Sequence, residues 1–273
     1  MVDGLPFVKM SGAGNDFVVL AGEDLGERDP VGLAARLCTR ALSLGADGLI
    51  VVEPAALDAV RIRFYNPDGS RAEMCGNGSR CAARYAVDRE LVAGESFRLL
   101  TDSGDLPVVV RAAGQFAVVM PEPNDIHFTQ MWVDDAGARY PLHALRVGVP
   151  HAVVVMPGVA RRTDAELTAL GRTLRHHPGF PDGTNVNFAD IAAGPPIRLR
   201  TYERGVEALT RACGTGSTAT AFVARALHDR AWPIDLEVDG GRLRVEAIDG
   251  ALWLVGDARI VARGVLGPDA LDW

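Results

Sequence analysis

Two short cysteine motifs carry the residues of this chain that are best suited to acid–base chemistry. Cys75-Gly-Asn-Gly-Ser recurs, about half the chain later, as Cys213-Gly-Thr-Gly-Ser. Each motif runs into a helix-forming segment, for which Ser79 and Ser217 are the expected N-caps. Each cysteine is therefore expected at a helix N-terminus, where unpaired backbone N–H groups and the positive end of the helix dipole favour a thiolate. The glycines allow the same amides to approach an anion such as a carboxylate.

Two equivalent thiols suit one particular reaction. If the halves of the chain close face to face, the two sulfurs approach one ligand from opposite sides. Inverting a carbon centre requires a base on one face to remove a proton and an acid on the other face to return one. The carbanion spreads its charge onto the neighbouring carboxylate, which the helix N-termini stabilise. The pattern therefore indicates racemisation or epimerisation without a cofactor.

The simpler interpretation of a cysteine before a helix is an inert buried residue, because free cysteine is commonly buried. A single Gly-x-Gly is also weak evidence for a ligand. The recurrence of the whole motif in both halves favours the functional interpretation for Cys75 and Cys213. Cys38 and Cys81 have no counterpart in the other half, so packing is the preferred interpretation for these two.

The composition excludes several other classes of function. The 273 residues include 28 basic and 35 acidic side chains and no basic block, so nucleic acid and anionic membranes are poor candidates as partners. The chain lacks a long apolar run, an export signal and a disulfide framework, which together favour the cytoplasm. Lys9, the single lysine, lies in an expected strand and is poorly placed for a Schiff base with pyridoxal phosphate. Zinc and P-loop motifs are also missing, so we expect no cofactor and no metal.

Further matches at nearly the same offset indicate an internal duplication. Tyr65 precedes the first cysteine motif as Tyr202 precedes the second, and segment 45–50 matches segment 183–188. We therefore expect two similar domains. Residues 1–128 form an N-terminal lobe with Cys75, and residues 129–273 form a C-terminal lobe with Cys213. Whether the last segment crosses back to the N-terminal lobe is left open.

Short β-branched runs between Gly, Pro, Asn and Asp predict strands in both halves. Helices are expected over residues 30–42 and 79–88 in the first half, and over 164–175, opened by Thr163, and 217–228 in the second. This order predicts an α+β fold of two pseudo-symmetric domains. Each domain would be a mostly antiparallel sheet wrapped around a helix, with the active site in the cleft between them.

Six segments resemble the motifs of the diaminopimelate epimerase family, whose relatives include proline racemase and hydroxyproline epimerase. These relatives have a histidine where this chain has Asn77. In the family's order, the segments are Phe7-Val-Lys-Met-Ser-Gly-Ala-Gly-Asn-Asp-Phe-Val-Val, Phe64-Tyr-Asn-Pro-Asp-Gly-Ser, Met74-Cys-Gly-Asn-Gly-Ser-Arg-Cys, Gly183-Thr-Asn-Val-Asn-Phe, Thr201-Tyr-Glu-Arg-Gly-Val and Ala212-Cys-Gly-Thr-Gly-Ser. The resemblance therefore covers essentially the whole chain.

The resemblance implies roles for individual residues. Cys75 and Cys213 would be the acid–base pair, and His151 and Glu203 would tune their thiols. The substrate would contact side chains of Asn15, Asn66, Asn185, Glu203 and Arg204, and its reacting carboxylate the amides of Gly76, Asn77, Gly214 and Thr215. Arg204 suits the second carboxylate of a substrate with two amino-acid ends.

Structural interpretations of several of these residues stay open. Asn15 and Asn66 lie in turn-like sequences, His151 precedes a strand, and Glu203 with Arg204 could be a surface ion pair. The remaining histidines and arginines are expected on the solvated surface.

The chain departs from the family pattern at three places. Gly48 replaces a frequent glutamine, Val149 replaces a frequent asparagine, and the segment between Gly205 and Cys213 is one residue longer. Two contacts to the distal end of the substrate are therefore expected to be missing or replaced.

The activity implied by the resemblance is the interconversion of LL- and meso-2,6-diaminopimelate, a step in lysine and peptidoglycan-precursor biosynthesis. The partner would be a small amino-acid substrate, and the family suggests a homodimer. Two alternatives stay open: another cofactor-independent amino-acid racemase of the same fold, and a non-catalytic two-lobed protein that binds an anionic amino acid.

Overall fold

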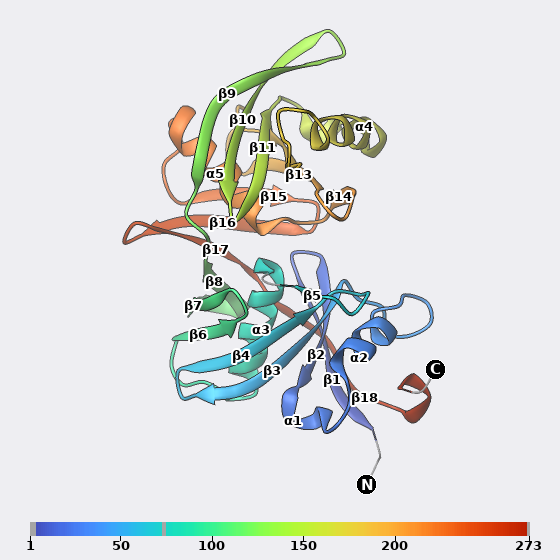
Figure 1. Ribbon diagram of the computed structural model, residues 1–273. Helices are drawn as coiled ribbons and strands as arrows, with labels where there is room; N and C mark the ends of the chain where they lie inside the picture. The colour runs from blue at the N-terminus through green and yellow to red at the C-terminus, as the bar shows by residue number, and fades with distance from the viewer. Residues whose placement is uncertain (1–3, 73–74, 272–273) are drawn as a thin grey trace. The chain divides into compact units, whose positions relative to one another are not determined.

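The computed structural model describes residues 4–72 and 75–271, so Met74 of the first cysteine motif lies outside the described residues. The chain divides into two compact units (Figure 1). Unit 1 contains the described residues up to Val118 and those from Gly256 onward, and unit 2 runs from Val119 to Val255. The boundary expected after residue 128 falls inside a strand of unit 2, β9 (Asn124–Asp135).

Unit 1 is built on a mostly antiparallel sheet. Antiparallel pairs join β18 to β1, β1 to β2, β3 to β4, β4 to β5, β6 to β7 and β7 to β8. The pairs β2–β3 and β4–β6 are parallel. The strands are β1 (Leu5–Gly12), β2 (Asn15–Ala21), β3 (Gly48–Ala56), β4 (Ala59–Tyr65), β5 (Arg71–Ala72), β6 (Ser96–Thr101), β7 (Gly104–Val110), β8 (Gln115–Val119) and β18 (Arg259–Leu266).

Unit 2 repeats the same pairing scheme with its own strands. Antiparallel pairs join β9 to β10, β10 to β11, β12 to β13, β13 to β14 and β15 to β16, and the pairs β11–β12 and β13–β15 are parallel. Besides β9, the strands are β10 (Ala138–Val147), β11 (Val149–Val155), β12 (Asn185–Asp190), β13 (Ile197–Glu203), β14 (Ala208–Thr210), β15 (Ile234–Val238), β16 (Gly241–Ile248) and β17 (Ala251–Asp257). The expected α+β fold with an internal duplication is confirmed.

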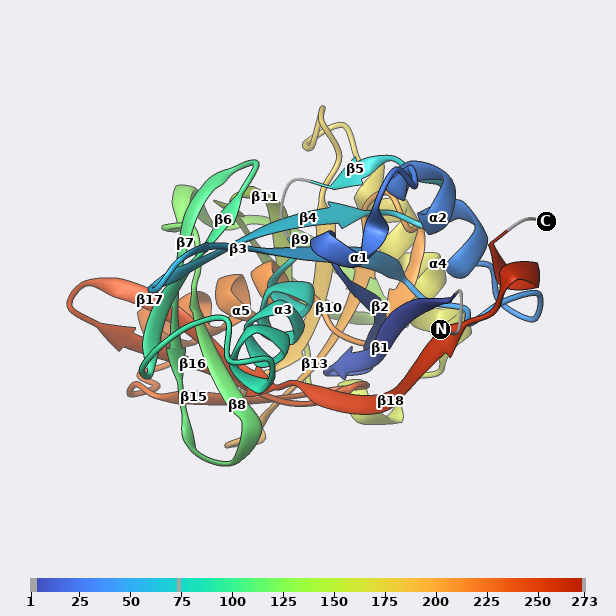
Figure 2. The same cartoon turned by 90° about the horizontal axis from the view of Figure 1, so that it is seen from below.

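One helix in each unit lies along one face of its sheet. In unit 1, α3 (Gly76–Asp88) contacts β1 to β4 (Figure 2), and in unit 2, α5 (Gly214–Leu227) contacts β10 to β13, β15 and β16. The opposite faces are covered by α2 (Pro30–Leu37) and α4 (Asp164–Arg175), whose leucines pack into the apolar cores. Unit 1 also contains the short helix α1 (Gly22–Leu25). Each sheet therefore has a helix on both faces.

The helix starts differ in detail from the sequence expectation. Ser79 and Ser217 are not caps, because α3 and α5 begin directly after Cys75 and Cys213, which occupy the N-cap positions. Thr163 caps α4 as expected, in a capping box with Glu166. The helix expected over 30–42 ends at Leu37.

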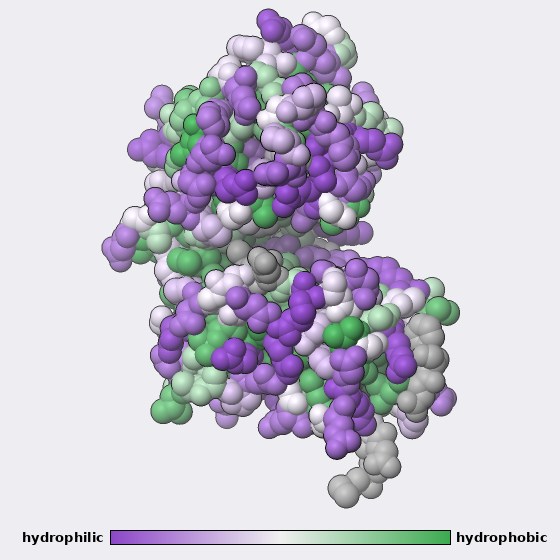
Figure 3. Space-filling model, in the orientation of Figure 1, coloured by the Kyte–Doolittle hydropathy of each residue, from purple (hydrophilic) through white to green (hydrophobic). Residues whose placement is uncertain are grey.

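The surface of each unit is mixed in character. In Figure 3 the visible face of unit 2 is largely hydrophilic, with small hydrophobic areas between hydrophilic residues. Within the described ranges, no helix combines the length and apolar character needed to span a membrane.

Candidate active site

Cys75 and Cys213 have the same local geometry in the two units. Both have extended backbone, with φ and ψ of −138° and 111° at Cys75 and of −121° and 113° at Cys213. In each case Sγ accepts a hydrogen bond at 3.4 Å from the amide three residues later, Gly78 or Gly216. The sulfur therefore occupies the place of a capping oxygen, beside the N–H groups that the first helical turn leaves without intrahelical partners.

Around Cys75, two of the other expected site residues join one hydrogen-bond network. Cys75 Sγ lies 3.7 Å from Asn15 Oδ1, which also accepts a bond at 3.4 Å from Asn77 Nδ2. The Asn15 amide nitrogen in turn donates to Asp47 Oδ2. Because an ionised carboxylate only accepts, Asp47 fixes which end of the Asn15 amide points toward the thiol.

Arg80 was missed by the sequence analysis, which placed the remaining arginines on the surface. Its side chain is fully buried on α3. The guanidinium donates to Asn77 Oδ1 at 2.8 Å and to the carbonyl oxygens of Gly76 and Asp257 at 3.3 and 3.4 Å. Burial lowers the pKa of Arg80, while the nearby thiols of Cys81 and Cys75 act in the opposite direction. Arg80 therefore places a buried cation at the start of the helix that Cys75 caps.

Cys213 lies in a different setting at the start of α5. Its Sγ lies 3.4 Å from the hydroxyl of Thr215, and the thiol side chain is almost completely buried. Thr218, at the position that matches Arg80, donates its hydroxyl hydrogen to Gly214 O at 3.0 Å. The helix start at Cys213 thus has a neutral side chain where the start at Cys75 has a cation.

His151 lies on β11 and is fully buried. Its Nδ1 lies 3.2 Å from Asn187 Nδ2, and within the described residues its Nε2 has no hydrogen-bond partner. Burial, followed by the charge of Arg204, lowers its pKa to about 3. The imidazole is therefore neutral at physiological pH. His143, one of the remaining histidines expected on the surface, is buried as well.

Asn185 and Arg204 are held together at the ends of β12 and β13. Asn185 Oδ1 accepts a 2.7 Å bond from the Arg204 amide, and Arg204 Nη1 donates to the Asp182 carbonyl at 3.0 Å. Asn185 is also the register partner of His151. Glu203 ends β13 directly before Arg204. The structure therefore gathers the expected residues of unit 2 at neighbouring strand ends.

Asn66 makes its described contacts inside its own turn. Its amide nitrogen donates to Ser70 Oγ at 2.9 Å, and its backbone N–H bonds to Ser70 O. At Gly48, a Cβ would lie 2.9 Å from Tyr65 O, so a glutamine there would require the neighbouring strand to shift. This close approach gives a packing reason for glycine at a position where the family often has glutamine.

The other two cysteines are buried, and the single lysine forms an ion pair. Burial raises the pKa of Cys38 to about 11 and that of Cys81 to about 12, as expected for packing residues. Lys9 Nζ forms an ion pair with Asp16 at 2.6 Å.

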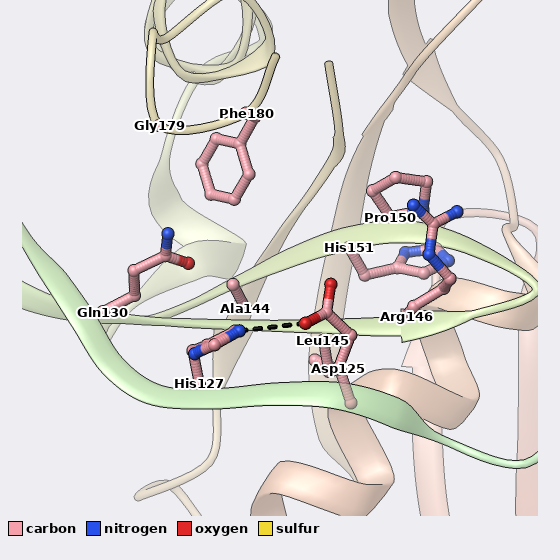
Figure 4. Close-up of a pocket in the computed structure, with 10 residues that line it drawn as sticks. All are labelled: Asp125, His127, Gln130, Ala144, Leu145, Arg146, Pro150, His151, Gly179 and Phe180. Atoms are coloured by element: carbon pink, nitrogen blue, oxygen red, sulfur yellow. Dashed lines mark hydrogen bonds and ion pairs between the residues drawn. The ribbon is translucent and has the colours of Figure 1, made fainter. Parts of the chain in front are cut away.

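A small pocket of about 160 Å³ opens in unit 2 beside His151. Figure 4 shows Arg146 and Pro150 close to the imidazole, and His127 hydrogen-bonded to Asp125, both on β9. Phe180 forms part of the opposite wall. The pocket therefore brings polar side chains of β9 and β10 to the edge of the strand that carries His151.

Comparison with known proteins decides the family. The family model described as "Diaminopimelate epimerase" matches residues 7–126 and 143–261. The chain is 38% identical over 275 residues to the diaminopimelate epimerase of Archaeoglobus fulgidus, covering 96% of each chain. It is 37% identical to that of Methanothrix thermoacetophila, covering 98% of each.

The chain belongs to the diaminopimelate epimerase family. Solved structures of distant relatives share its fold. A PhzF-family phenazine biosynthesis protein of Bacillus anthracis has a TM-score of 0.72 at 13% identity, covering 97% of this chain and 99% of that one. A hydroxyproline epimerase of Agrobacterium vitis has a TM-score of 0.67 at 17% identity, covering 98% and 94%. As in other members of the diaminopimelate epimerase family, the fold is a duplicated α+β unit, which confirms the expectation.

Proposed function

We propose that this chain is an isomerase that converts LL-2,6-diaminopimelate to the meso form, with Cys75 and Cys213 as its acid–base pair. One observation carries the proposal. In a chain of this family, two cysteines cap two equivalent helices, and each sulfur lies 3.4 Å from the same amide of its motif. A pair of matched groups is what a reaction between two stereoisomers requires.

In the proposed reaction the two thiols act on opposite faces of the α-carbon. One cysteine, as thiolate, removes the α-proton and becomes a thiol. The electron pair of the broken C–H bond moves onto the carboxylate, and the other cysteine delivers its S–H proton to the opposite face and becomes a thiolate. The number of protons is unchanged, and the next turnover can run in the reverse direction.

The reacting carboxylate is proposed to lie on the first amides of α3 and α5. Those of Gly76, Asn77, Gly214 and Thr215 belong to first turns, where the helix dipole favours negative charge. Thiol tuning is assigned to His151 and Glu203. Substrate contacts are assigned to Asn15, Asn66, Asn185, Glu203 and Arg204.

Recognition of the distal end is proposed to rest mainly on Arg204 and Asn185. The guanidinium suits a carboxylate, and the Asn185 side chain already orders the Arg204 backbone. With glycine at position 48 and valine at position 149, neither of these positions offers a polar side chain. We place the enzyme in the cytoplasm as a homodimer, with no metal or pyridoxal phosphate in the reaction.

The decisive experiment follows the α-protons in D₂O. Wild-type protein is expected to exchange the α-proton of LL-diaminopimelate and to produce the meso isomer. Cys75→Ala and Cys213→Ala should each lower epimerisation by at least about 10²–10⁴-fold, the usual contribution of an acid–base group. Cys38→Ala and Cys81→Ala are matched controls that should keep near-normal rates.

A substrate analogue with a β-leaving group distinguishes the two faces. Each single mutant should eliminate from the one isomer that presents its α-hydrogen to the surviving sulfur, and the preferred isomers should be opposite. If both mutants attacked the same isomer, the two-thiol mechanism would be wrong. Exchange with a different amino acid alone would indicate a related racemase, and binding without exchange would indicate a non-catalytic protein.

A further inference from the structure

The surface beneath the α5 N-terminus is formed by a hydrogen-bonded trio, His151, Asn187 and Thr201. Asn187 is fully buried in the middle of β12. Its Nδ2 lies 3.2 Å from both His151 Nδ1 and the Ala152 carbonyl oxygen, and its Oδ1 accepts a 3.0 Å bond from the Thr201 hydroxyl. All these residues belong to unit 2.

The partners of Asn187 fix the orientation of its amide. A backbone carbonyl can only accept, so the end of the amide that faces Ala152 must be the NH₂ group. The same nitrogen faces His151 Nδ1, and it therefore meets this ring atom as a donor. A proton on Nδ1 would place two donors against each other in a buried site, at the cost of an unsatisfied group.

We propose that Asn187 is a positioning residue that holds His151 as a neutral ring with its proton on Nε2, so that His151 serves as a hydrogen-bond donor and not as a base. The Nε2 atom is buried without a partner in the described part of the chain. Its N–H is thus available to an acceptor that enters the site. The identity of the acceptor rests on the proposed function. An N–H donor of this kind suits an anion, either a thiolate or the substrate carboxylate.

The matching site in unit 1 shows that this arrangement is not a requirement of the fold. Phe17 pairs with Gly48 on β2–β3 as His151 pairs with Asn185 on β11–β12. Two residues further along, Ile50 pairs with Phe64, as Asn187 pairs with Thr201. The structural equivalents of His151, Asn187 and Thr201 are therefore Phe17, Ile50 and Phe64.

The glycines of the two motifs confirm this equivalence by contact. A Cβ on Gly78 would lie 2.7 Å from Phe64, 3.3 Å from Phe17 and 3.4 Å from Ile50. A Cβ on Gly216 would instead overlap Oδ1 of Asn187 and lie 3.3 Å from Cys213 Sγ. Asn187 thus lies directly under the first turn of α5, between the cysteine's helix and His151. A polar trio at this place adds function, since apolar side chains suffice to support the same helix start in unit 1.

The test is an ¹⁵N NMR measurement of the imidazole nitrogens at pH 7, without substrate. The protein is labelled at its histidines, and His151→Gln identifies the signal by its loss. We expect Nε2 to resonate as a protonated nitrogen and Nδ1 as an unprotonated acceptor.

Asn187→Asp replaces the NH₂ group with an acceptor, so the proton should move to Nδ1 or the ring should become charged. In that variant kcat should fall by about 10–100-fold, as when the partner that orients a functional histidine is lost, with a smaller change in KM.

Thr201→Val is the matched control, because it removes a contact of Asn187 and leaves the NH₂ group against the ring. Its His151 signals should keep the wild-type pattern. A wild-type ring protonated at Nδ1, or charged, would overturn the inference, and so would an Asn187→Asp ring that keeps the wild-type pattern. If N187D does not fold, the wild-type and Thr201→Val spectra still decide the tautomer. A protein with the expected tautomer but without epimerase activity would contradict the proposed function and leave the inference intact.

Discussion

Unit 1 and unit 2 hold their cysteines with the same backbone arrangement, but the side chains beneath the two helix starts are apolar in unit 1 and polar in unit 2. Cys75 and Cys213 have similar cap geometry, yet α3 starts over an apolar surface and α5 over a hydrogen-bonded one. The charge on the helix differs too, because buried Arg80 in unit 1 corresponds to neutral Thr218 in unit 2. The cap geometry therefore depends on neither the apolar nor the polar character of the surface beneath the helix. The two thiols can therefore be tuned separately while their position is conserved.

The strongest test makes the surface beneath α5 resemble that beneath α3. His151→Phe combined with Asn187→Ile and Thr201→Val replaces the polar trio with side chains like those of unit 1. Replacing hydrogen-bonded partners together by apolar side chains of similar shape can be nearly neutral or stabilising, so the fold should persist by circular dichroism. Epimerisation should fall by about 10²–10³-fold, the usual effect of losing one preorganised donor.

The reciprocal change serves as the control. Ile50→Asn places an amide beside the side chains of Phe17 and Phe64. It should lower the free energy of unfolding by about 1–3 kcal/mol, because aromatic rings of this kind offer the amide no carbonyl or hydroxyl partner. If the variant with His151→Phe, Asn187→Ile and Thr201→Val kept the wild-type rate of epimerisation, the polar trio would be dispensable.

Acid should destabilise unit 2 before unit 1. All six histidines lie within residues 119–255, and burial lowers the pKa of His151 to about 3 and that of His143 to about 4. The unfolded chain binds protons at these rings from about pH 6.5 downward, whereas the folded chain does not. Their contribution to stability is therefore complete above pH 6.5 and is lost as the pH falls toward 4, by about 1.4 kcal/mol per pH unit for each ring.

Hydrogen exchange at pH 7 and pH 5 measures this difference between the units. Peptides of unit 2 should lose protection at pH 5 while those of unit 1 keep more of theirs. His143→Phe should remove about half of the effect, and the exposed His127→Gln should leave it unchanged. Equal loss in both units would contradict the assignment to buried histidines.

Arg80→Met should reduce the reactivity of Cys75 selectively. Removing the buried cation takes away a favourable charge near this thiol and two hydrogen bonds that order Gly76 and Asn77. Alkylation of Cys75 by iodoacetamide at neutral pH should slow by about tenfold, equivalent to about 1.4 kcal/mol. Cys213 in the same molecule is the internal control, and Arg80→Lys should restore part of the rate. A parallel slowing at both cysteines would indicate general unfolding instead.

The smallest expected effects concern the helices on the outer faces. Asp29 caps α2 by accepting from Val31 and Gly32, and Thr163 caps α4 in a capping box. Asp29→Ala and Thr163→Ala should each lower the free energy of unfolding by about 1 kcal/mol in urea titrations. Neither should change kcat, since both caps lie on helices that do not carry the cysteines.

Sequence patterns predicted the duplication, the fold class and the helix that follows each cysteine motif. They misplaced the caps, because a thiol is a rare capping group and serine a common one. They missed Arg80, since arginine is seldom buried without an acidic partner. The sequence match did not reveal that Ile50 and Asn187 are equivalent, because it is shifted by one residue from the structural alignment of the two strands. Matching segment 45–50 to 183–188 sets Ile50 against Phe188, and a shift of one residue exchanges the two faces of a strand.

The return of the chain end to unit 1 has a consequence for biosynthesis. Strand β18 pairs along β1, although the whole of unit 2 separates them in sequence. A ribosome therefore releases every strand of unit 2 before it releases the last strand of unit 1. Domains generally fold in the order of their synthesis. Here the unit that begins first is completed last, and a nascent chain that stalls after residue 255 exposes the edge of β1 for which β18 is the partner.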